Sequence, residues 1–132
     1  MRYLLDTDTC IYAIKQRPDV LEKLLSKSRA DVAVSVITEA ELRTGAAKSS
    51  SSQRTERLVE SFLRPLEIAP FTSEDAFSYA RVRAHLERAG TPIGPLDTLI
   101  AAQAVARKLV LVTNNEREFG RVPGLRLENW SS

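Results

Sequence analysis

Continuous apolar runs alternate with stretches of helical periodicity along the chain. The runs are short and rich in leucine, isoleucine and valine, which is typical of strands buried on both faces of a sheet. Such strands are predicted at residues 2–6, 32–34, 66–68 and 110–113, and a last edge strand at residues 126–128.

Between the strands, apolar residues recur every three or four positions, as on one face of an amphipathic helix. Asp8 or Thr9 is expected to cap a first helix that extends through Ile14, and Pro18 opens a second. Further helices are predicted at residues 38–47, 54–63, 73–90 and 117–119, and another begins at Asp97. Strands that alternate with helices in this way predict an α/β fold with a mainly parallel sheet.

The length and composition fit one globular domain spanning residues 1–132. The chain shows no internal repeat, no signal peptide and no apolar segment near the roughly 20 residues that a membrane span requires. We therefore expect a cytoplasmic protein without membrane association. Cys10 is the only cysteine, which excludes an intramolecular disulfide and a CxxC motif.

The charge balance is a weak indication of an anionic partner. The net charge is +2, and fourteen of the nineteen basic residues are arginine, whose guanidinium group binds phosphate through two parallel hydrogen bonds. Such a surface suits RNA, DNA or an acidic peptide. An arginine-rich composition also follows from a GC-rich genome, so charge alone does not identify the partner.

Three acidic residues stand where a globular domain ordinarily avoids charge. Asp6 closes the first apolar run, Glu41 lies in the helix after the second strand, and Asp97 lies on the apolar stripe of its helix. Because an unpaired buried carboxylate is costly, such residues persist when they are paired or bind a metal. Carboxylates that converge from separate elements suit Mg²⁺, with Mn²⁺ as the alternative.

The predicted sheet brings the polar residues together. In an open parallel sheet, ligand sites form beyond the carboxyl ends of the strands. Asp6 ends the first strand, and Asn114 and Asn115 follow the fourth. Glu41 and Asp97 lie near helix starts that border the same edge. A metal-dependent nuclease is the hypothesis that uses all of these residues.

Four short motifs follow one another over nearly the whole chain: LLDTD at 4–8, SVITEAELRTG at 35–45, PIGPLD at 92–97 and TNNEREF at 113–119. Each motif alone is weak, but the ordered set is specific. With these motifs the chain resembles the PIN-domain ribonucleases, and most closely the VapC toxins of type II toxin–antitoxin pairs.

The resemblance implies a three-layer α/β/α fold and an endoribonuclease that depends on Mg²⁺. Carried over to this sequence, the catalytic metal-binding acids are Asp6, Glu41 and Asp97. Water activated by the metal is the expected nucleophile, and structured RNA, with tRNA among the candidates, is the expected substrate. The resemblance also implies inhibition by a VapB-like antitoxin and a homodimeric state.

The chain departs from the common family pattern after the fourth strand, where many members carry a fourth acidic residue. Asn115 holds the nearest position; it can coordinate through its carbonyl oxygen or hold a water, but it adds no charge. Glu118 can contribute through a water or can be a solvated helix residue. Thr7, Asp8 and Thr113 are candidates for hydrogen bonding to the metal ligands or the phosphate, and Asp8 is equally a helix cap.

Two other functions fit part of the sequence. Asp6 and Asp8 match the DxDxT motif of haloacid-dehalogenase-type phosphohydrolases, where they would serve as nucleophile and acid–base. That alternative leaves Glu41 and Asp97 without a role, and no acidic pair follows the fourth strand. An inactive PIN-fold module that only binds partners is the non-enzymatic alternative, because one acidic ligand is missing.

Overall fold

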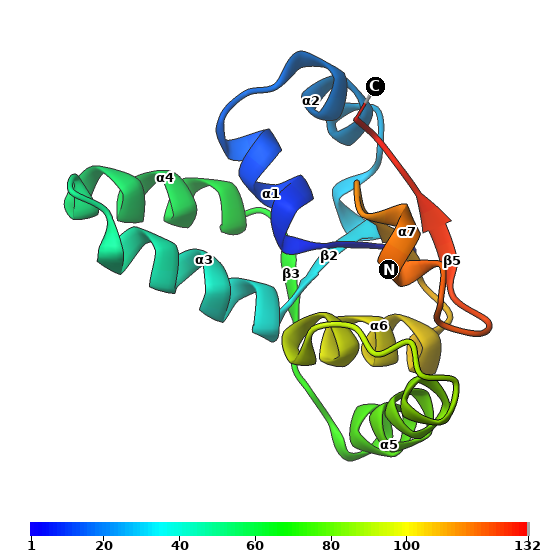
Figure 1. Cartoon of the computed structure of the whole chain (residues 1–132). Helices are drawn as coiled ribbons and strands as arrows, with labels where there is room; N and C mark the ends of the chain where they lie inside the picture. The colour runs from blue at the N-terminus through cyan, green and yellow to red at the C-terminus, as the bar shows by residue number, and fades with distance from the viewer. Residues whose placement is uncertain (132) are drawn as a thin grey trace.

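The computed structural model describes residues 1–131 and contains a central sheet of five strands (Figure 1). The strands are β1 Tyr3–Leu5, β2 Val32–Ser35, β3 Glu67–Ala69, β4 Val110–Val112 and β5 Arg126–Glu128. Their order is β3-β2-β1-β4-β5, and every neighbouring pair is parallel. The predicted parallel sheet is therefore confirmed, including the edge strand at 126–128.

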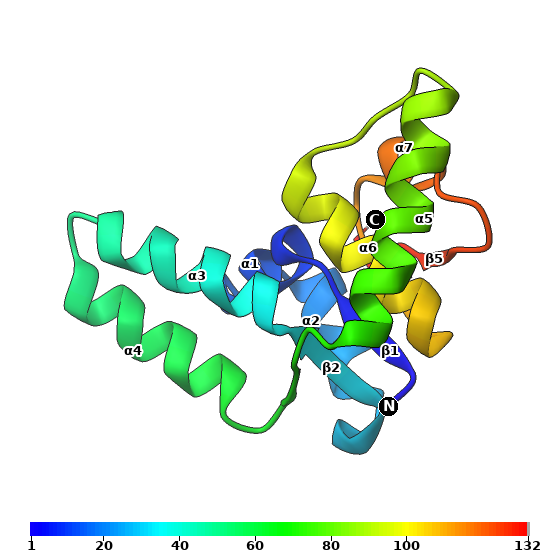
Figure 2. The ribbon, with the colours of Figure 1, turned by 90° about the horizontal axis from the view of Figure 1, so that it is seen from below.

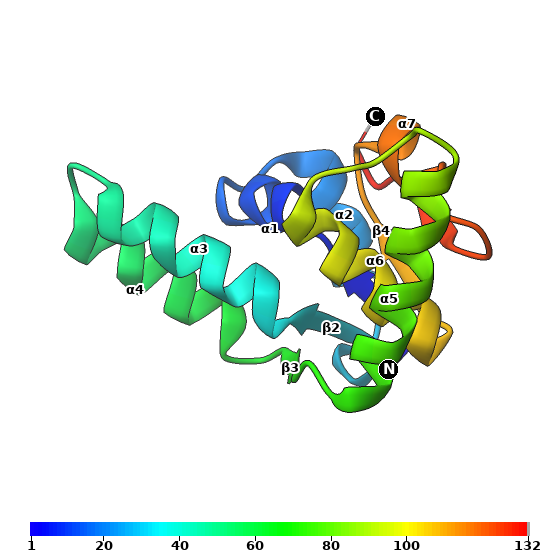
Figure 3. The ribbon, with the colours of Figure 1, turned by 60° about the horizontal axis from the view of Figure 1, so that its bottom comes forward.

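Helices connect the strands and cover both faces of the sheet. They are α1 Thr7–Ile14, α2 Pro18–Leu25, α3 Val36–Lys48, α4 Ser52–Leu63, α5 Ser73–Arg88, α6 Pro95–Arg107 and α7 Glu116–Phe119. The pair α5 and α6 lies on the opposite side of the sheet from α1 and α2, and α3 and α4 form a hairpin that extends away from it (Figures 1, 2 and 3). This is the expected three-layer α/β/α arrangement. Among the helices of residues 1–131, none has the length and apolar character needed to cross a membrane.

The central strand β1 divides its side chains between two cores. Tyr3 and Leu5 pack with side chains of α1, α3 and α4, whereas Leu4 packs with those of α5 and α6. This division follows from the alternation of side chains along a strand. Trp130 belongs to the core that contains Tyr3 and Leu5. Its ring packs edge-on against Tyr3 with the ring centroids 5.5 Å apart.

Helix starts are where the structure corrects the sequence prediction. The N-cap of α1 is Asp6, not Asp8 or Thr9: an Asp6 side-chain oxygen accepts a hydrogen bond from the Thr9 backbone N–H at 2.8 Å. Helix α3 begins at Val36 instead of residue 38, because the Ser35 hydroxyl already caps it. Helix α4 likewise begins two residues earlier than predicted, at Ser52 instead of residue 54.

The course of the chain reverses between β1 and β4. From β1 the chain moves outward through β2 to β3, and it then returns through α5 and α6 to β4, on the other side of β1. Right-handed crossovers place the helices of the two directions on opposite faces of the sheet. A reversal of this kind is where open α/β sheets bind ligands, beyond the carboxyl ends of the two strands.

A buried ion pair joins the two helices that cover the second face. Asp75 of α5 is completely buried, and its carboxylate lies 2.9 Å from the Arg107 guanidinium of α6. The same carboxylate accepts a hydrogen bond from the Thr72 backbone N–H at 2.8 Å. Burial alone would raise the pKa of Asp75, but the hydrogen bonds from Arg107 and Thr72 and the charge of Arg107 hold it below its usual value.

Candidate active site

Asp6 occupies the position directly after β1 and is only 4% exposed. Its carboxylate caps α1 and also forms a hydrogen bond with the Thr113 side chain, which follows β4. Burial raises the pKa of Asp6; the hydrogen bonds from Thr113 and Thr9 act in the opposite direction, and the charge of Asp8 adds to the increase. One carboxylate therefore starts a helix and links the carboxyl ends of β1 and β4.

Glu41 reaches the same region from α3. It is half-buried, and its carboxylate accepts a hydrogen bond of 2.7 Å from the Thr7 hydroxyl at the start of α1. The Thr7 hydroxyl oxygen also lies 3.3 Å from that of Thr38. Glu39, two positions earlier on the same helix, is instead paired with Arg43 at 2.9 Å. Glu41, and not Glu39, is thus the α3 glutamate that faces the start of α1.

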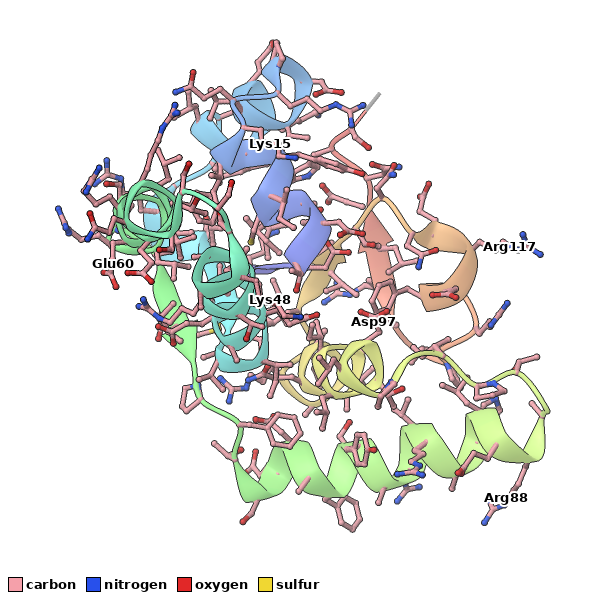
Figure 4. The ribbon with its side chains drawn as sticks, turned by 60° about the vertical axis from the view of Figure 1, so that its left-hand side comes forward. Lys15, Lys48, Glu60, Arg88, Asp97 and Arg117 are labelled. Carbon is pink, nitrogen blue, oxygen red and sulfur yellow. The ribbon has the colours of Figure 1, made fainter. Side chains whose placement is uncertain are left out.

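Asp97 lies in the first turn of α6, half-buried at the edge of the core, while Ile100 one turn further on is fully buried. Figure 4 shows it between the start of α6 and the short helix α7, whose Arg117 points away from the molecule. The pKa of Asp97 is raised to about 6, first by burial and then by the charges of Glu41, Asp6, Glu118 and Asp8, in that order. The predicted acids are therefore close enough to influence one another.

The sequence left two roles open for Glu118, a contribution to the site through a water and a solvated helix residue. It is half-buried on α7, and its charge contributes to the raised pKa of Asp97. The Asn115 side-chain amide donates a hydrogen bond of 2.7 Å to the Glu118 carboxylate. Asn114 points elsewhere: its side-chain oxygen accepts a hydrogen bond from the Ser131 hydroxyl at 2.7 Å. The two asparagines of the motif thus have separate surroundings.

The donor set suits a hard divalent cation, because it consists of carboxylate oxygens. In the part of the chain that the structure describes, however, no group of three or more His, Cys, Asp or Glu side chains is arranged to hold a metal ion. Glu41 and Glu118 are each hydrogen-bonded to a neighbouring side chain, Thr7 and Asn115 respectively. Carboxylates that repel one another favour this open arrangement, and a cation would favour closing it.

The supporting residues behave differently from one another. Thr7 and Thr113, predicted as candidates for supporting the acids, hydrogen-bond to Glu41 and Asp6. Asp8 is exposed on α1 and contributes charge. Sequence reasoning missed the contact between Asn115 and Glu118, although an Asn three residues before a Glu at a helix start has the spacing of a capping box.

Known proteins share this fold and this arrangement of the chain. A family model described as PIN domain matches residues 3–125. The tRNA(fMet)-specific endonuclease VapC of Salmonella typhimurium is 42% identical over 130 residues, covering 98% of each chain. Ribonuclease VapC2 of Rickettsia felis is 43% identical over 133 residues, again covering 98% of each. The crystal structure of DNA-bound VapBC from Salmonella typhimurium superimposes with a TM-score of 0.94 at 41% identity, covering 99% of both chains.

These similarities define the class of protein, a PIN-fold nuclease. The chain belongs to the PIN-domain family and, within it, to the VapC ribonucleases. Nucleases of this kind depend on a metal ion. The phosphohydrolase alternative is wrong, because the family match covers almost the whole chain.

Proposed function

We propose that the protein is a Mg²⁺-dependent endoribonuclease that acts in the cytoplasm as the toxin of a toxin–antitoxin pair, with Mn²⁺ able to replace Mg²⁺. The observation that carries this proposal is the set of acids Asp6, Glu41 and Asp97 on separate elements of a chain that is 42% identical to a tRNA(fMet)-specific endonuclease. Burial and the neighbouring carboxylates raise the pKa of Asp97 to about 6. Such mutual repulsion among acids is expected where a cation belongs. When bound, the cation supplies Lewis-acid activation of water and neutralises charge on the phosphate.

The residues of the site divide into ligands and supports. Asp6, Glu41 and Asp97 are the metal-binding acids. Glu118 supplies the fourth acidic group that the sequence lacks at position 115. Thr7 orients Glu41, and the hydroxyl of Thr113 orients Asp6.

The substrate we propose is a structured RNA, with initiator tRNA as the first candidate. The relative that is 42% identical over 98% of its length is a tRNA(fMet)-specific endonuclease. The fourteen arginines of the chain provide donors for phosphate contacts. Initiator tRNA is therefore the probe for a first assay, with an elongator tRNA beside it as the comparison.

The partner we propose is an antitoxin whose tail enters the acidic site. A VapBC complex is the structure that superimposes with a TM-score of 0.94. An arginine or lysine of the antitoxin would pair with Asp6 and Asp97 in place of the cation. Leu25 of α2 is 75% exposed and borders a groove of about 420 Å³ that also contacts Phe62 and Leu66, which suits apolar residues of the same peptide. We also propose a homodimer, which light scattering tests.

The decisive experiment is cleavage of tRNA(fMet) with Mg²⁺ by the wild-type protein and by Asp97→Asn. The substitution keeps the shape of the side chain and removes its charge, so cleavage should be abolished while the fold remains. Asp8→Asn is the matched control on an exposed acid of the same region and should retain most of the activity. Undiminished cleavage by Asp97→Asn would contradict the site, and a wild-type protein that binds RNA without cleaving it would support the inactive binding module.

A further inference from the structure

We infer that Asn115 is a positioning residue that fixes the direction of the Glu118 carboxylate, so that Glu118 serves as the fourth acid of the metal site. The inference rests on the proposed function, because it concerns the same site. It assigns to Asn115 a role through its neighbour rather than direct contact with the metal.

Both ends of the Asn115 amide engage the same residue. Its nitrogen donates to the Glu118 carboxylate at 2.7 Å, and its oxygen accepts from the Glu118 backbone N–H at 3.4 Å. The oxygen caps α7 and fixes the backbone of Glu118. The nitrogen fixes the direction of the carboxylate, which a cap alone would leave free to rotate.

Helix α7 depends on such contacts because it has only four residues. A helix this short has too few internal hydrogen bonds to be stable alone. At its far end, the Gly120 N–H donates a backbone hydrogen bond to the Glu116 carbonyl oxygen at 2.8 Å. The direction of the Glu118 side chain therefore depends on the first end of the helix, which Asn115 forms.

Asn115 is itself tied to the rest of the site through a buried hydroxyl. Its backbone N–H donates to the Thr113 hydroxyl oxygen at 2.9 Å, and the Thr113 side chain hydrogen-bonds to Asp6. Thr113 is completely buried. The turn after β4 therefore connects Asp6 with Glu118. The connection consists of the hydrogen bonds of Thr113 and Asn115.

The chemistry at position 115 favours an amide over other caps. Serine, threonine or aspartate would cap a helix as well as asparagine does. Serine and threonine carry a single hydroxyl oxygen, whereas the asparagine amide places its acceptor and its donor on two atoms, so that one caps the backbone N–H of Glu118 while the other reaches the carboxylate. An aspartate would add charge next to acids that already raise the pKa of Asp97.

The test is Mn²⁺ affinity, followed through the free-ion signal in electron paramagnetic resonance. The proteins compared are wild type, Asn115→Ser, Glu118→Gln, the double variant and Asn114→Ser. Serine keeps the cap and removes the amide donor, so the thermal unfolding midpoint of Asn115→Ser should stay at the wild-type value. Asn115→Ser and Glu118→Gln should each weaken Mn²⁺ binding roughly tenfold or more. The double variant should bind no more weakly than Glu118→Gln, because both changes remove the same contact.

Asn114→Ser is the matched control, because Asn114 contacts the C-terminal segment and not the acids. It should bind Mn²⁺ as the wild type does. Wild-type affinity in Asn115→Ser or in Glu118→Gln would overturn the inference, and so would additive losses in the double variant. Loss of binding in Asp97→Asn without loss in Asn115→Ser would overturn the inference alone. A wild-type protein that binds no Mn²⁺ would overturn the proposed function together with it.

Discussion

Asp97 shows at the level of one residue how this site opposes folding. Burial and the surrounding acids favour its neutral form and raise its pKa to about 6. In the absence of a cation, the ionised carboxylate is therefore less favourable in the folded chain than in the unfolded one. A cation between the acids would turn these repulsions into attractions. Metal binding would therefore stabilise the folded chain as well as supply the chemistry.

The pH dependence of stability follows from this shift. The folded pKa of Asp97 lies above its unfolded value of 3.8, so the folded chain binds more protons between about pH 4 and 6. The free energy of unfolding should therefore decrease as pH rises through this interval, and the loss should be complete above about pH 7. A shift of this size corresponds to about 3 kcal/mol at most, and solvent screening of a half-exposed group reduces it to about 1 kcal/mol.

Urea unfolding of wild type and Asp97→Asn, both with a chelator, measures this contribution. The Asn variant should be more stable than wild type at pH 7.5 by the same amount, on the order of 1 kcal/mol. Well below pH 4 the difference should vanish, because Asp97 is then protonated in both the folded and the unfolded chain. The two proteins share all other titrating groups, so the contributions of those groups to the free energy of unfolding largely cancel in the difference. Parallel pH profiles for the two proteins would contradict the assignment.

Single residues were predictable from sequence where their chemistry was locally out of place. Asp6 and Asp97 interrupt apolar patterns, and that conflict was visible without a structure. The hydrogen bond from Thr7 to Glu41 joins residues 34 positions apart, so no local pattern contains it. The contact between Asn115 and Glu118 is local, but its spacing also fits an ordinary solvated helix start.

At the level of elements, the strands and the helix starts at Pro18 and Ser73 were predictable, whereas the starts of α1, α3 and α4 were not. The strands have continuous apolar runs that no other element accounts for. A helix start depends on which of several polar side chains reaches a free backbone N–H. Asp6, Asp8 and Thr9 all suit a cap by type. The end of β1 decides among them, because the Asp6 N–H is already hydrogen-bonded to the Val112 carbonyl at 3.0 Å.

The contact between α5 and α6 leads to a second prediction, for Arg107→Met. The substitution leaves the fully buried Asp75 without its charged partner, and breaking a buried pair is strongly destabilising. Because Arg107 itself keeps 23% of its side chain exposed, we expect a loss of about 2–3 kcal/mol in the free energy of unfolding, slightly below the range for fully buried pairs. Urea unfolding at pH 7 measures it.

Arg83→Met is the control for this experiment. Arg83 pairs with Glu87 on the surface, where the two side chains are 59% and 50% exposed. Exposed pairs contribute little, so this variant should change stability by less than about 1 kcal/mol. Equal losses in the free energy of unfolding for Arg83→Met and Arg107→Met would show that the burial of Asp75 does not determine how strongly Arg107→Met destabilises the fold. Adding Asp75→Asn to Arg107→Met should recover part of the loss, since it removes the unpaired charge.

At the level of the whole molecule, the parallel sheet explains why the acids meet. Helices α1 and α7 directly follow the parallel strands β1 and β4, with Asp6 at the cap of α1 and Glu118 in the first turn of α7, while α6, which follows α5, has Asp97 in its first turn. Helix N-termini favour negative charge, which partly offsets the repulsion among these groups. The strand order of the sheet is not written in any one segment. The sequence predicted a mainly parallel sheet, but it did not predict the order of the strands.

The proposed function has a consequence for the living cell that depends on Asp6. Expression of the wild-type chain without an antitoxin should arrest growth, and Asp6→Asn should not. Asparagine is the informative substitution, because Asp6 also caps α1 through its bond to Thr9 and asparagine caps equally well. Alanine would remove the cap at a cost of about 1 kcal/mol, so that misfolding would resemble loss of catalysis. The measurement is the growth curve of cells that express each chain, together with the amount of soluble protein. Equal growth arrest by both chains at comparable amounts of soluble protein would exclude a toxin that acts through the Asp6 carboxylate.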